Sequence, residues 1–462
     1  MKTFAIIGAG FSGTVAAIEF LNRAQDKANL IIINRLGLMA RGLAYGTNSP
    51  QHLLNVPAGN MTALVDDPDS FLEYCQAQDP TVTASSFISR KIYGEYLESL
   101  LKDAIKRAEH RVKTIQIIAE VTRLQISDSA AMIELDSGEL IQADHVALTF
   151  GHFPPSTPPG LEPITGTHHY HRDPWEQSPG LPVDKNASIL LMGSGLTAVD
   201  VVTNLMKSAH AGKIYMLSRR GLLPKAHRVS RGHASASTRI KDLLLEATPS
   251  TLEYLKILRK EISFKSKEGV DWRDIIGSIR PITATLWKRL PDAERRRFLR
   301  HVQSYWDVHR HRVAPETYRV FEEALKSGQL VPIAGRIESI TLEDGLISAR
   351  VSERRKERKR DLSVDLVVNC TGPTSNLKKI SNTLIKQLLD DGLILSDSLG
   401  LGVCVDEHYS LKNRLNQTNQ RLSYVGPMLK AEHWELTAVP ELREAARAVA
   451  ISVWGCFQKQ EK

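Results

Sequence analysis

Two glycine-rich segments carry the residue pattern most suited to chemistry. The first, GAGFSG at residues 8–13, follows an apolar run at residues 2–7 and opens a stretch with helical periodicity. In such a strand–loop–helix unit Gly8 permits a tight turn, Gly10 lets the backbone approach a pyrophosphate, and Gly13 lets the helix pack on the strand. We therefore predict a dinucleotide site whose residues here are Gly8, Gly10, Phe11, Ser12 and Gly13.

The position that normally reads the ribose is unusual. About twenty residues beyond such a loop an acidic side chain accepts hydrogen bonds from the ribose, but this chain has Asn34 there. An amide can still accept one such bond, and Asn34 can equally be the end of a strand. Both interpretations stay open.

The second glycine-rich segment is GSGLTA at residues 193–198, again between an apolar run and a helical pattern. Its predicted cofactor-binding residues are Gly193, Gly195, Leu196 and Thr197. The next predicted strand ends at Arg219 and Arg220, where a 2′-phosphate would lie. Two cations at this place favour NADPH over NADH.

Two further apolar runs, residues 146–151 and 366–372, each end in a glycine, Gly151 and Gly372, and are typical of the joints between paired dinucleotide-binding domains. Between them a helical pattern predicts helices at residues 251–262, 272–290, 292–310 and 316–326. We expect an α/β fold with two Rossmann-like domains, the second nested in the first, and an α-helical insertion. The predicted bounds are 1–152 for the first part of the FAD domain and 153–373 for the NAD(P)H domain, with its insertion at 236–330. Residues 374–462 are predicted to return to the FAD domain and complete it.

The composition is typical of a globular protein. Of 462 residues 42% are hydrophobic and 24% charged, with a net charge of +8, which is ordinary for a globular chain. The four cysteines form no Cys-x-x-Cys pair, so the sequence contains no cysteine motif for a metal site. We expect a reducing, cytoplasmic location. No apolar run is long enough for a membrane. The basic run at 354–360 predicts a solvated hairpin tip rather than a nucleic-acid site.

Five longer stretches resemble a known family: residues 41–47, 52–58, 90–97, 305–312 and 434–443. They are similar to the two-dinucleotide-binding-domain flavoproteins, and among these to the bacterial FAD/NAD(P)-binding family related to FAD-dependent urate hydroxylase and flavin monooxygenases. The resemblance implies a flavin beside the last stretch, where a helix starting near Pro440 would direct its N–H groups at the ring. The residues it adds are Asn55, Val56, Met61, Thr437 and Pro440 for the cofactor, and His433 and Trp434 for catalysis.

Residues 164–175 resemble the flavin monooxygenase fingerprint F-x-G-x-x-x-H-x-x-x-W. Ile164 replaces the phenylalanine and one extra residue separates Gly166 from His171. His171 is a third catalytic candidate, or else a linker histidine, and Trp175 is a packing residue. The histidines and arginines of residues 309–312 could hold an anionic substrate or form a solvated helix face.

Together these features predict an FAD-dependent NAD(P)H oxidoreductase with FAD and NADPH as cofactors, NADH being the weaker coenzyme. The resemblance implies a flavin monooxygenase that hydroxylates a small polar molecule through a C4a-peroxyflavin. One alternative is a reductase or dehydrogenase that does not use oxygen. Another is a redox-responsive FAD/NADPH-binding protein that acts on a protein partner. The expected partner is a small-molecule substrate, without nucleic acid or membrane, and the sequence leaves the oligomeric state open.

Overall fold

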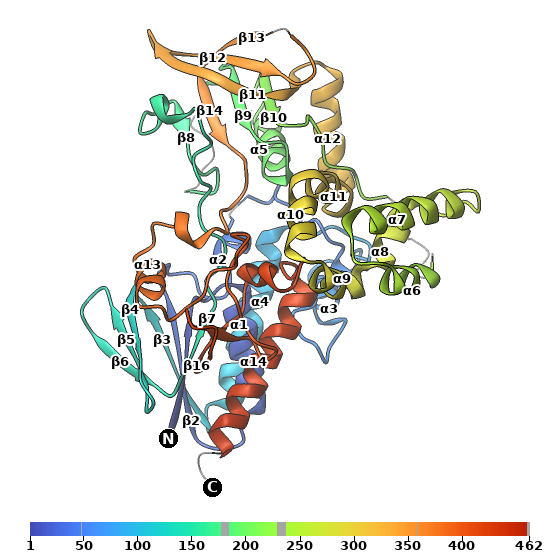
Figure 1. Cartoon of the computed structure of the whole chain (residues 1–462). Helices are drawn as coiled ribbons and strands as arrows, with labels where there is room; N and C mark the ends of the chain where they lie inside the picture. The colour runs from blue at the N-terminus through green and yellow to red at the C-terminus, as the bar shows by residue number, and fades with distance from the viewer. Residues whose placement is uncertain (48, 177–183, 229–236, 358, 460–462) are drawn as a thin grey trace.

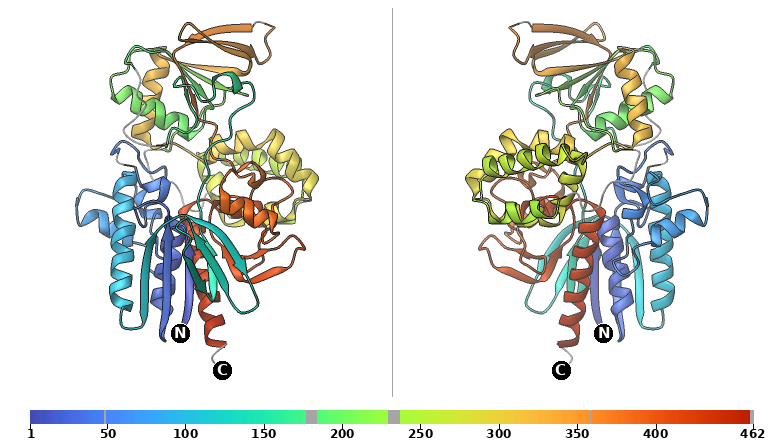
Figure 2. Two further views of the ribbon diagram at one scale, coloured as in Figure 1. Left: turned by 90° about the vertical axis from the view of Figure 1, so that its left-hand side faces the viewer. Right: turned by 90° about the vertical axis from the view of Figure 1, so that its right-hand side faces the viewer.

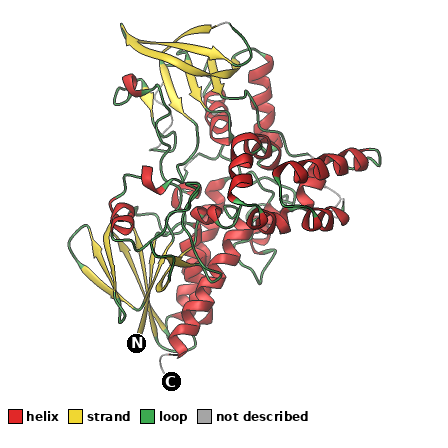
Figure 3. Cartoon of the chain, viewed as in Figure 1, coloured by secondary structure: helices red, strands yellow, loops and turns green. Residues whose placement is uncertain are grey.

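The computed structural model describes residues 1–47, 49–176, 184–228, 237–357 and 359–459 (Figure 1). Helices and strands form two α/β lobes with a group of helices beside them (Figure 3). The predicted α/β fold class, with two dinucleotide-binding domains and a helical insertion, is confirmed. The bounds at 152 and 373 stay predictions, and the predicted insertion start, 236, lies outside the described residues.

The first lobe is built on a six-stranded sheet in the order β15-β16-β7-β1-β2-β3. Five strands are parallel, and only β15 (Ser410–Lys412) runs against its neighbour. Because helices cover a parallel sheet, its central strands β1, β2 and β7 are mainly apolar and buried, whereas β3 and β16 are mixed. The parallel strands are β1 (Lys2–Ile7), β2 (Ala28–Asn34), β3 (Val112–Ile118), β7 (His145–Leu148) and β16 (Thr418–Tyr424).

Helices α1 (Phe11–Arg23), α4 (Arg90–Ala108) and α14 (Val439–Lys459) belong to this lobe. The last of them, although at the far end of the chain, packs on the first, and the rings of Phe20 and Trp454 lie 5.8 Å apart. The C-terminal segment is thus an integral part of the N-terminal lobe.

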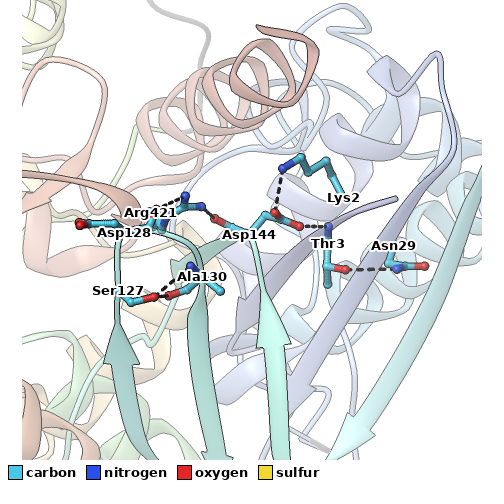
Figure 4. A network of polar contacts seen from close by, with 8 residues as sticks. All are labelled: Lys2, Thr3, Asn29, Ser127, Asp128, Ala130, Asp144 and Arg421. Atoms are coloured by element: carbon cyan, nitrogen blue, oxygen red, sulfur yellow. Dashed lines mark hydrogen bonds and ion pairs between the residues drawn. The ribbon is translucent and has the colours of Figure 1, made fainter. Parts of the chain in front are cut away.

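Polar contacts also join the C-terminal segment to the N-terminal lobe (Figure 4). Arg421 of β16 donates through Nη1 to the carbonyl of Asp144 at 2.9 Å and through Nε to that of Asp128 at 3.1 Å. The Asp144 carboxylate in turn pairs with Lys2 at 3.1 Å and accepts the Thr3 N–H at 2.8 Å. Segments from three parts of the chain therefore meet where the interior strands β1 and β7 begin, beside β16.

The second lobe has a seven-stranded sheet in the order β13-β12-β11-β10-β9-β14-β8. Its parallel part includes β8 (Tyr170–His171), β9 (Ile189–Met192), β10 (Ile214–Ser218) and β14 (Leu366–Asn369), with α5 (Leu196–Lys207) and α12 (Pro315–Lys326) against it. An antiparallel extension follows in β11 (Leu330–Glu343), β12 (Leu346–Glu353) and β13 (Lys359–Val364). The basic run lies where β12 turns into β13, as predicted. A small sheet of β4 (Val121–Ile126), β5 (Ala131–Leu135) and β6 (Leu140–Ala143) borders the first lobe.

The insertion contains α6 (Arg239–Glu246), α7 (Thr251–Ser266), α8 (Trp272–Ser278), α9 (Thr283–Arg289), α10 (Asp292–His301) and α11 (Gln303–Arg310). The prediction of unbroken helices at 272–290 and 292–310 is wrong. Pro281 ends the first, since it lacks an N–H and clashes with the preceding turn. The second breaks at Val302, which lets Phe298 and Trp306 contact the same C-terminal segment.

That C-terminal segment, residues 427–438, lies beside the insertion in both views of Figure 2. Within the described ranges, no helix is both long and apolar enough to cross a bilayer. The same ranges contain no group of three or more His, Cys, Asp or Glu residues placed to hold a metal ion.

Candidate functional site

The first glycine loop has the geometry that its sequence requires. Gly8 has φ +108°, and a side chain at Gly13 would place its Cβ 2.0 Å from the Gly8 carbonyl. The loop is tied to the next strand because the Gly8 N–H donates to the Ile33 carbonyl at 2.8 Å. Both glycines are therefore needed for the turn itself.

The loop also fits a pyrophosphate. Gly10 is the N-cap of α1, where no side chain caps the first turn and no acidic residue occupies it. A Cβ at Gly10 would meet Gly42 Cα at an ordinary contact distance of 3.6 Å and no other described atom within 4 Å outside its own helix, so only Gly42 approaches this position. Unpaired N–H groups at a helix start attract an anion. The free donors are those of Phe11, Ser12 and Gly13.

Asn34 ends β2 as predicted, and its amide is engaged by the backbone. Its Oδ1 accepts the Ala9 N–H at 3.3 Å, and its Nδ2 donates to the carbonyls of Leu36 and Leu38. Asn34 thus links the glycine loop to the turn after β2. One oxygen lone pair is left for a ribose, so contact with the cofactor stays a prediction.

The second loop repeats this arrangement at the end of β9. Gly193 has φ +113°, and a Cβ there would lie 2.4 Å from the Cys370 carbonyl after β14. At Gly195, the N-cap of α5, an added Cβ would meet nothing within 4 Å. No side chain caps this helix and its first turn holds no acidic residue. The N–H groups of Leu196 and Thr197 are accordingly available to a second phosphate-bearing ligand.

The two arginines that follow β10 have different surroundings. Arg220 donates to the carbonyls of His301 and Arg300 at 2.7 and 2.6 Å, at the C-terminal end of α10, and stacks on Tyr305 with 5.0 Å between guanidinium and ring centre. Arg219 is exposed and forms no hydrogen bond or ion pair with described residues. Arg219 is thus the cation free to meet a 2′-phosphate.

The remaining predicted cofactor residues come from segments that the fold joins. The Asn55 carbonyl accepts from His227 Nε2 at 2.9 Å, and Arg443 in α14 donates to the Thr62 carbonyl at 2.9 Å. The second contact brings the start of α14 to the segment after Met61. Val56 is half-buried and Met61 is buried. Gly151 is exposed after β7, and Gly372, after β14, has φ +89°. Thr437 and Pro440 lie where α14 begins.

His171 lies on β8 at the edge of the second sheet, where Val368 of β14 is its strand partner. It is half-buried, and burial lowers the pKa of its ring, so the imidazole is neutral at pH 7. Four residues on, Trp175 lies between His52, whose ring meets it edge-on with 5.2 Å between centroids, and the Arg90 guanidinium, 5.4 Å from its ring centre. Trp175 is therefore a packing residue between the two lobes.

The same interface includes one face of α5. Arg90 pairs with Asp200 at 2.9 Å, and Asn204 lies 2.6 Å from His52 Nε2. These contacts hold the second glycine loop and its helix against the first lobe.

Trp434 and His433 occupy the segment beside the insertion. Trp434 is 4% exposed, and its ring lies 4.6 Å from that of Trp287 and 5.1 Å from that of Phe298. His433 is half-buried 5.8 Å from Tyr409, and burial lowers its pKa to about 4. Trp434 thus joins the insertion to the C-terminal segment, whereas His433 keeps a neutral ring.

Sequence reasoning named Arg310 and His311 as part of an anion-binding or solvated helix face but missed the residues beside them. Together with Asp307, Lys430 and Glu435 they form a group that we call the joint cluster. Glu435, buried with φ +72°, accepts from Arg310 at 2.7 Å and from the Trp306 indole. Burial raises the pKa of Asp307 to about 6 and lowers that of His311 to about 4, although their side chains are 39% and 40% exposed. Helical spacing links Asp307, Arg310 and His311 along α11 and its C-cap. No spacing rule links them to Lys430 and Glu435, which come from the C-terminal segment.

Comparisons with known proteins agree with this geometry. Residues 5–153 match the family described as FAD-NAD(P)-binding. No curated protein sequence is significantly similar to this chain. Among solved structures, ornithine hydroxylase from Pseudomonas aeruginosa superposes with a TM-score of 0.63 at 17% identity, covering 99% of this chain and 100% of that one.

Two further structures show the same fold. An ornithine N-hydroxylase from Kutzneria sp. 744, solved with reduced FAD, NADP+ and L-ornithine, gives a TM-score of 0.62 at 12% identity over 98% and 99% of the chains. Bacillithiol disulfide reductase from Staphylococcus aureus gives 0.55 at 12% identity over 99% of each. Residues 5–153 thus match an FAD-NAD(P)-binding family, and the whole chain shares the fold of these solved structures.

Proposed function

We propose that this chain is an FAD-dependent NADPH oxidoreductase that hydroxylates a small molecule. The observation that carries the proposal is the pair of open glycine loops, each at the end of a parallel strand and each leading into a helix without a side-chain cap. Two such loops in one chain suit two dinucleotides. Hydroxylases among the proteins of the same fold favour oxygen as the final acceptor.

The first lobe, residues 1–152 with 374–462, binds FAD in this proposal, and residues 153–373 bind NADPH. Gly10 and the N–H groups after it hold the FAD pyrophosphate, Gly195 and its helix hold that of NADPH, and Arg219 pairs with the 2′-phosphate. FAD, when bound, accepts a hydride from NADPH and passes the electrons to oxygen. The α5 interface keeps the two cofactor sites in a fixed relation.

The catalytic candidates are neutral bases. His433, with a pKa of about 4, and His171, with a lowered pKa, can each accept a hydrogen bond or a proton at pH 7. Trp434 excludes water beside His433 by packing on the insertion. Asp307 and Lys430 of the joint cluster provide groups of opposite charge for a polar substrate.

A non-oxygenating reductase is the second candidate, because a disulfide reductase shares the fold. Its support is weaker, since all four cysteines are free and none stands near another in the sequence. Oxygen and NADPH consumption measured together separate the two: a hydroxylase consumes both in step with product, whereas a reductase needs another acceptor. The free cysteines also agree with a cytoplasmic location.

The FAD assignment is tested by Gly10→Val. The purified wild type should be yellow and release FAD, identified by mass, whereas the variant should be colourless because a branched side chain fills the open space beside the loop. Gly37→Val, in an exposed turn, is the matched control and should retain FAD. A variant at Gly10 with full flavin content would refute this placement.

A further inference from the structure

The short connection from α11 to α12 joins the insertion to the second lobe and also borders the first (Figure 1). Within it Val313 forms a parallel bridge with Ala226. The next residue, His227, donates through Nε2 to the Asn55 carbonyl of the first lobe at 2.9 Å. Bridged residues share one face and side chains alternate along an extended chain, so Arg312 and His227 lie on the same side of this pair. Arg312 therefore faces the segment of the first lobe that contains Asn55.

The four basic residues that end α11 and follow it have different surroundings. His309 donates to a carbonyl of its own helix at 2.7 Å, and Arg310 pairs with Glu435 at 2.7 Å. His311 is neutral at pH 7, because burial lowers its pKa to about 4. Arg312 is half-buried and forms no hydrogen bond or ion pair with the described part of the chain. Its Nε is buried, whereas its two Nη groups are not and are the part that a ligand can reach.

The surroundings of Arg312 are cationic, and the nearby carboxylates are already bound. Burial and three neighbouring arginines lower the pKa of Arg312 to about 10; these neighbours are Arg310, Arg273 and Arg228. Asp271 favours the charge of Arg312, but Arg273 binds that carboxylate at 3.1 Å. Arg228 likewise pairs with a carboxylate on α8. Among the described residues one positive charge is left uncompensated, and a partly buried charge is costly unless it is paired.

We propose that Arg312 binds the carboxylate of the substrate, and that this substrate carries no ammonium group beside its carboxylate. The proposal rests on the proposed function, since the Asn55 segment that Arg312 faces is assigned to FAD. The planar guanidinium matches the two oxygens of a carboxylate. An ammonium group next to that carboxylate would meet repulsion from the same arginines, whose carboxylate partners are engaged. The substrate class is therefore a simple carboxylic acid and not an α-amino acid.

Three probes of similar shape separate these features. They are 4,4,4-trifluorobutyrate, its neutral amide 4,4,4-trifluorobutyramide, and 2-amino-4,4,4-trifluorobutyrate, which adds the α-ammonium group. Their binding to the full chain is measured by fluorine NMR titration at low ionic strength, because salt screens charge interactions. The acid should bind at least about tenfold more tightly than either of the other probes. The titration involves no turnover, so a chain that failed to hydroxylate any substrate would refute the proposed function without changing this result.

Variants assign the binding to one side chain. Arg312→Gln should weaken the acid about tenfold or more and leave the amide unchanged. Arg312→Lys keeps the charge but not the planar fork, and should bind the acid with intermediate affinity while still preferring it to the amide. Arg319→Gln, an exposed change on α12, is the matched control and should alter neither.

NADPH separates a substrate carboxylate from a coenzyme phosphate as the anion at this site. Its affinity should be the same in Arg312→Gln as in the wild type. An equal loss of NADPH and acid affinity in this variant would overturn the proposal, because the anion would then be a phosphate of the coenzyme. Binding of either other probe by the wild type as tightly as the acid, or unchanged acid binding by Arg312→Gln, would overturn it as well.

Discussion

At the scale of single residues, we expect coenzyme choice to depend on Arg219. A charged hydrogen bond contributes about 1.5–3 kcal/mol, so Arg219→Ala should weaken NADPH roughly ten- to a hundredfold, at about 1.4 kcal/mol per decade. NADH should be almost unaffected. Arg220→Ala should have a smaller effect on NADPH, because its guanidinium is held by the carbonyls of Arg300 and His301. Binding titrations of both variants with both coenzymes measure this, and equal losses for NADH and NADPH would contradict it.

Asp307 makes stability depend on pH. Its pKa is raised from 3.8 to about 6 in the folded protein, so between these values the folded state binds more protons and stability falls as the pH rises. Asp307→Asn removes the unfavourable charge. The variant should have a higher unfolding temperature than the wild type at pH 8, and the difference should shrink towards pH 4.

Thermal unfolding across this pH range provides the measurement. Asp26→Asn, in an exposed loop, is the control and should show no such pH-dependent gain. If Asp307→Asn lost stability at pH 8, the attraction of the Asp307 carboxylate to the charge of Lys430 would outweigh burial.

The sequence was sufficient for residues whose role is set by neighbours along the chain. Gly8, Gly10 and Gly193 could be predicted because a tight turn and an open helix start need glycine at fixed spacing. The different roles of Arg219 and Arg220 could not, since the carbonyls that hold Arg220 belong to a helix some eighty residues away. The role of Glu435 could not be predicted for the same reason, because its partners lie on α11.

At the scale of elements, Glu435 fastens the insertion to the C-terminal segment. Its carboxylate is 7% exposed and accepts from two side chains of α11, those of Trp306 and Arg310. Glu435→Gln keeps the shape but removes the charge, and should lower the free energy of unfolding by about 1–3 kcal/mol. It should also expose α10 and α11 to limited proteolysis.

Urea unfolding and protease digestion test this prediction side by side. Glu444→Gln, an exposed change on α14, is the matched control and should leave both unchanged. Normal stability and normal protease resistance of Glu435→Gln would show that the aromatic contacts of Trp434 suffice to hold the insertion.

Helix existence could be predicted in the insertion, but helix ends could not. Apolar spacing of three and four residues indicated α7 and α12 correctly. That spacing continues across Pro281 and Val302, where the chain nevertheless changes direction. Proline gives a local reason for the first break, whereas the second depends on contacts with Trp434 and Glu435, which periodicity does not record.

At the scale of the whole molecule, the first lobe, to which we assign FAD, is assembled from both ends of the chain. β16 completes the parallel sheet beside β7, and α14 covers α1, the helix that starts at the first glycine loop. Deleting residues 376–462 should therefore abolish FAD retention although residues 8–13 are untouched, because the edge of β7 and the apolar face of α1 would be exposed to water. Flavin content and circular dichroism of the truncated protein measure the outcome. Adding the separate fragment 376–462 should restore yellow colour, since the missing strand and helix can dock again. A folded truncation that retains normal FAD without the fragment would show that the N-terminal segment binds the cofactor alone.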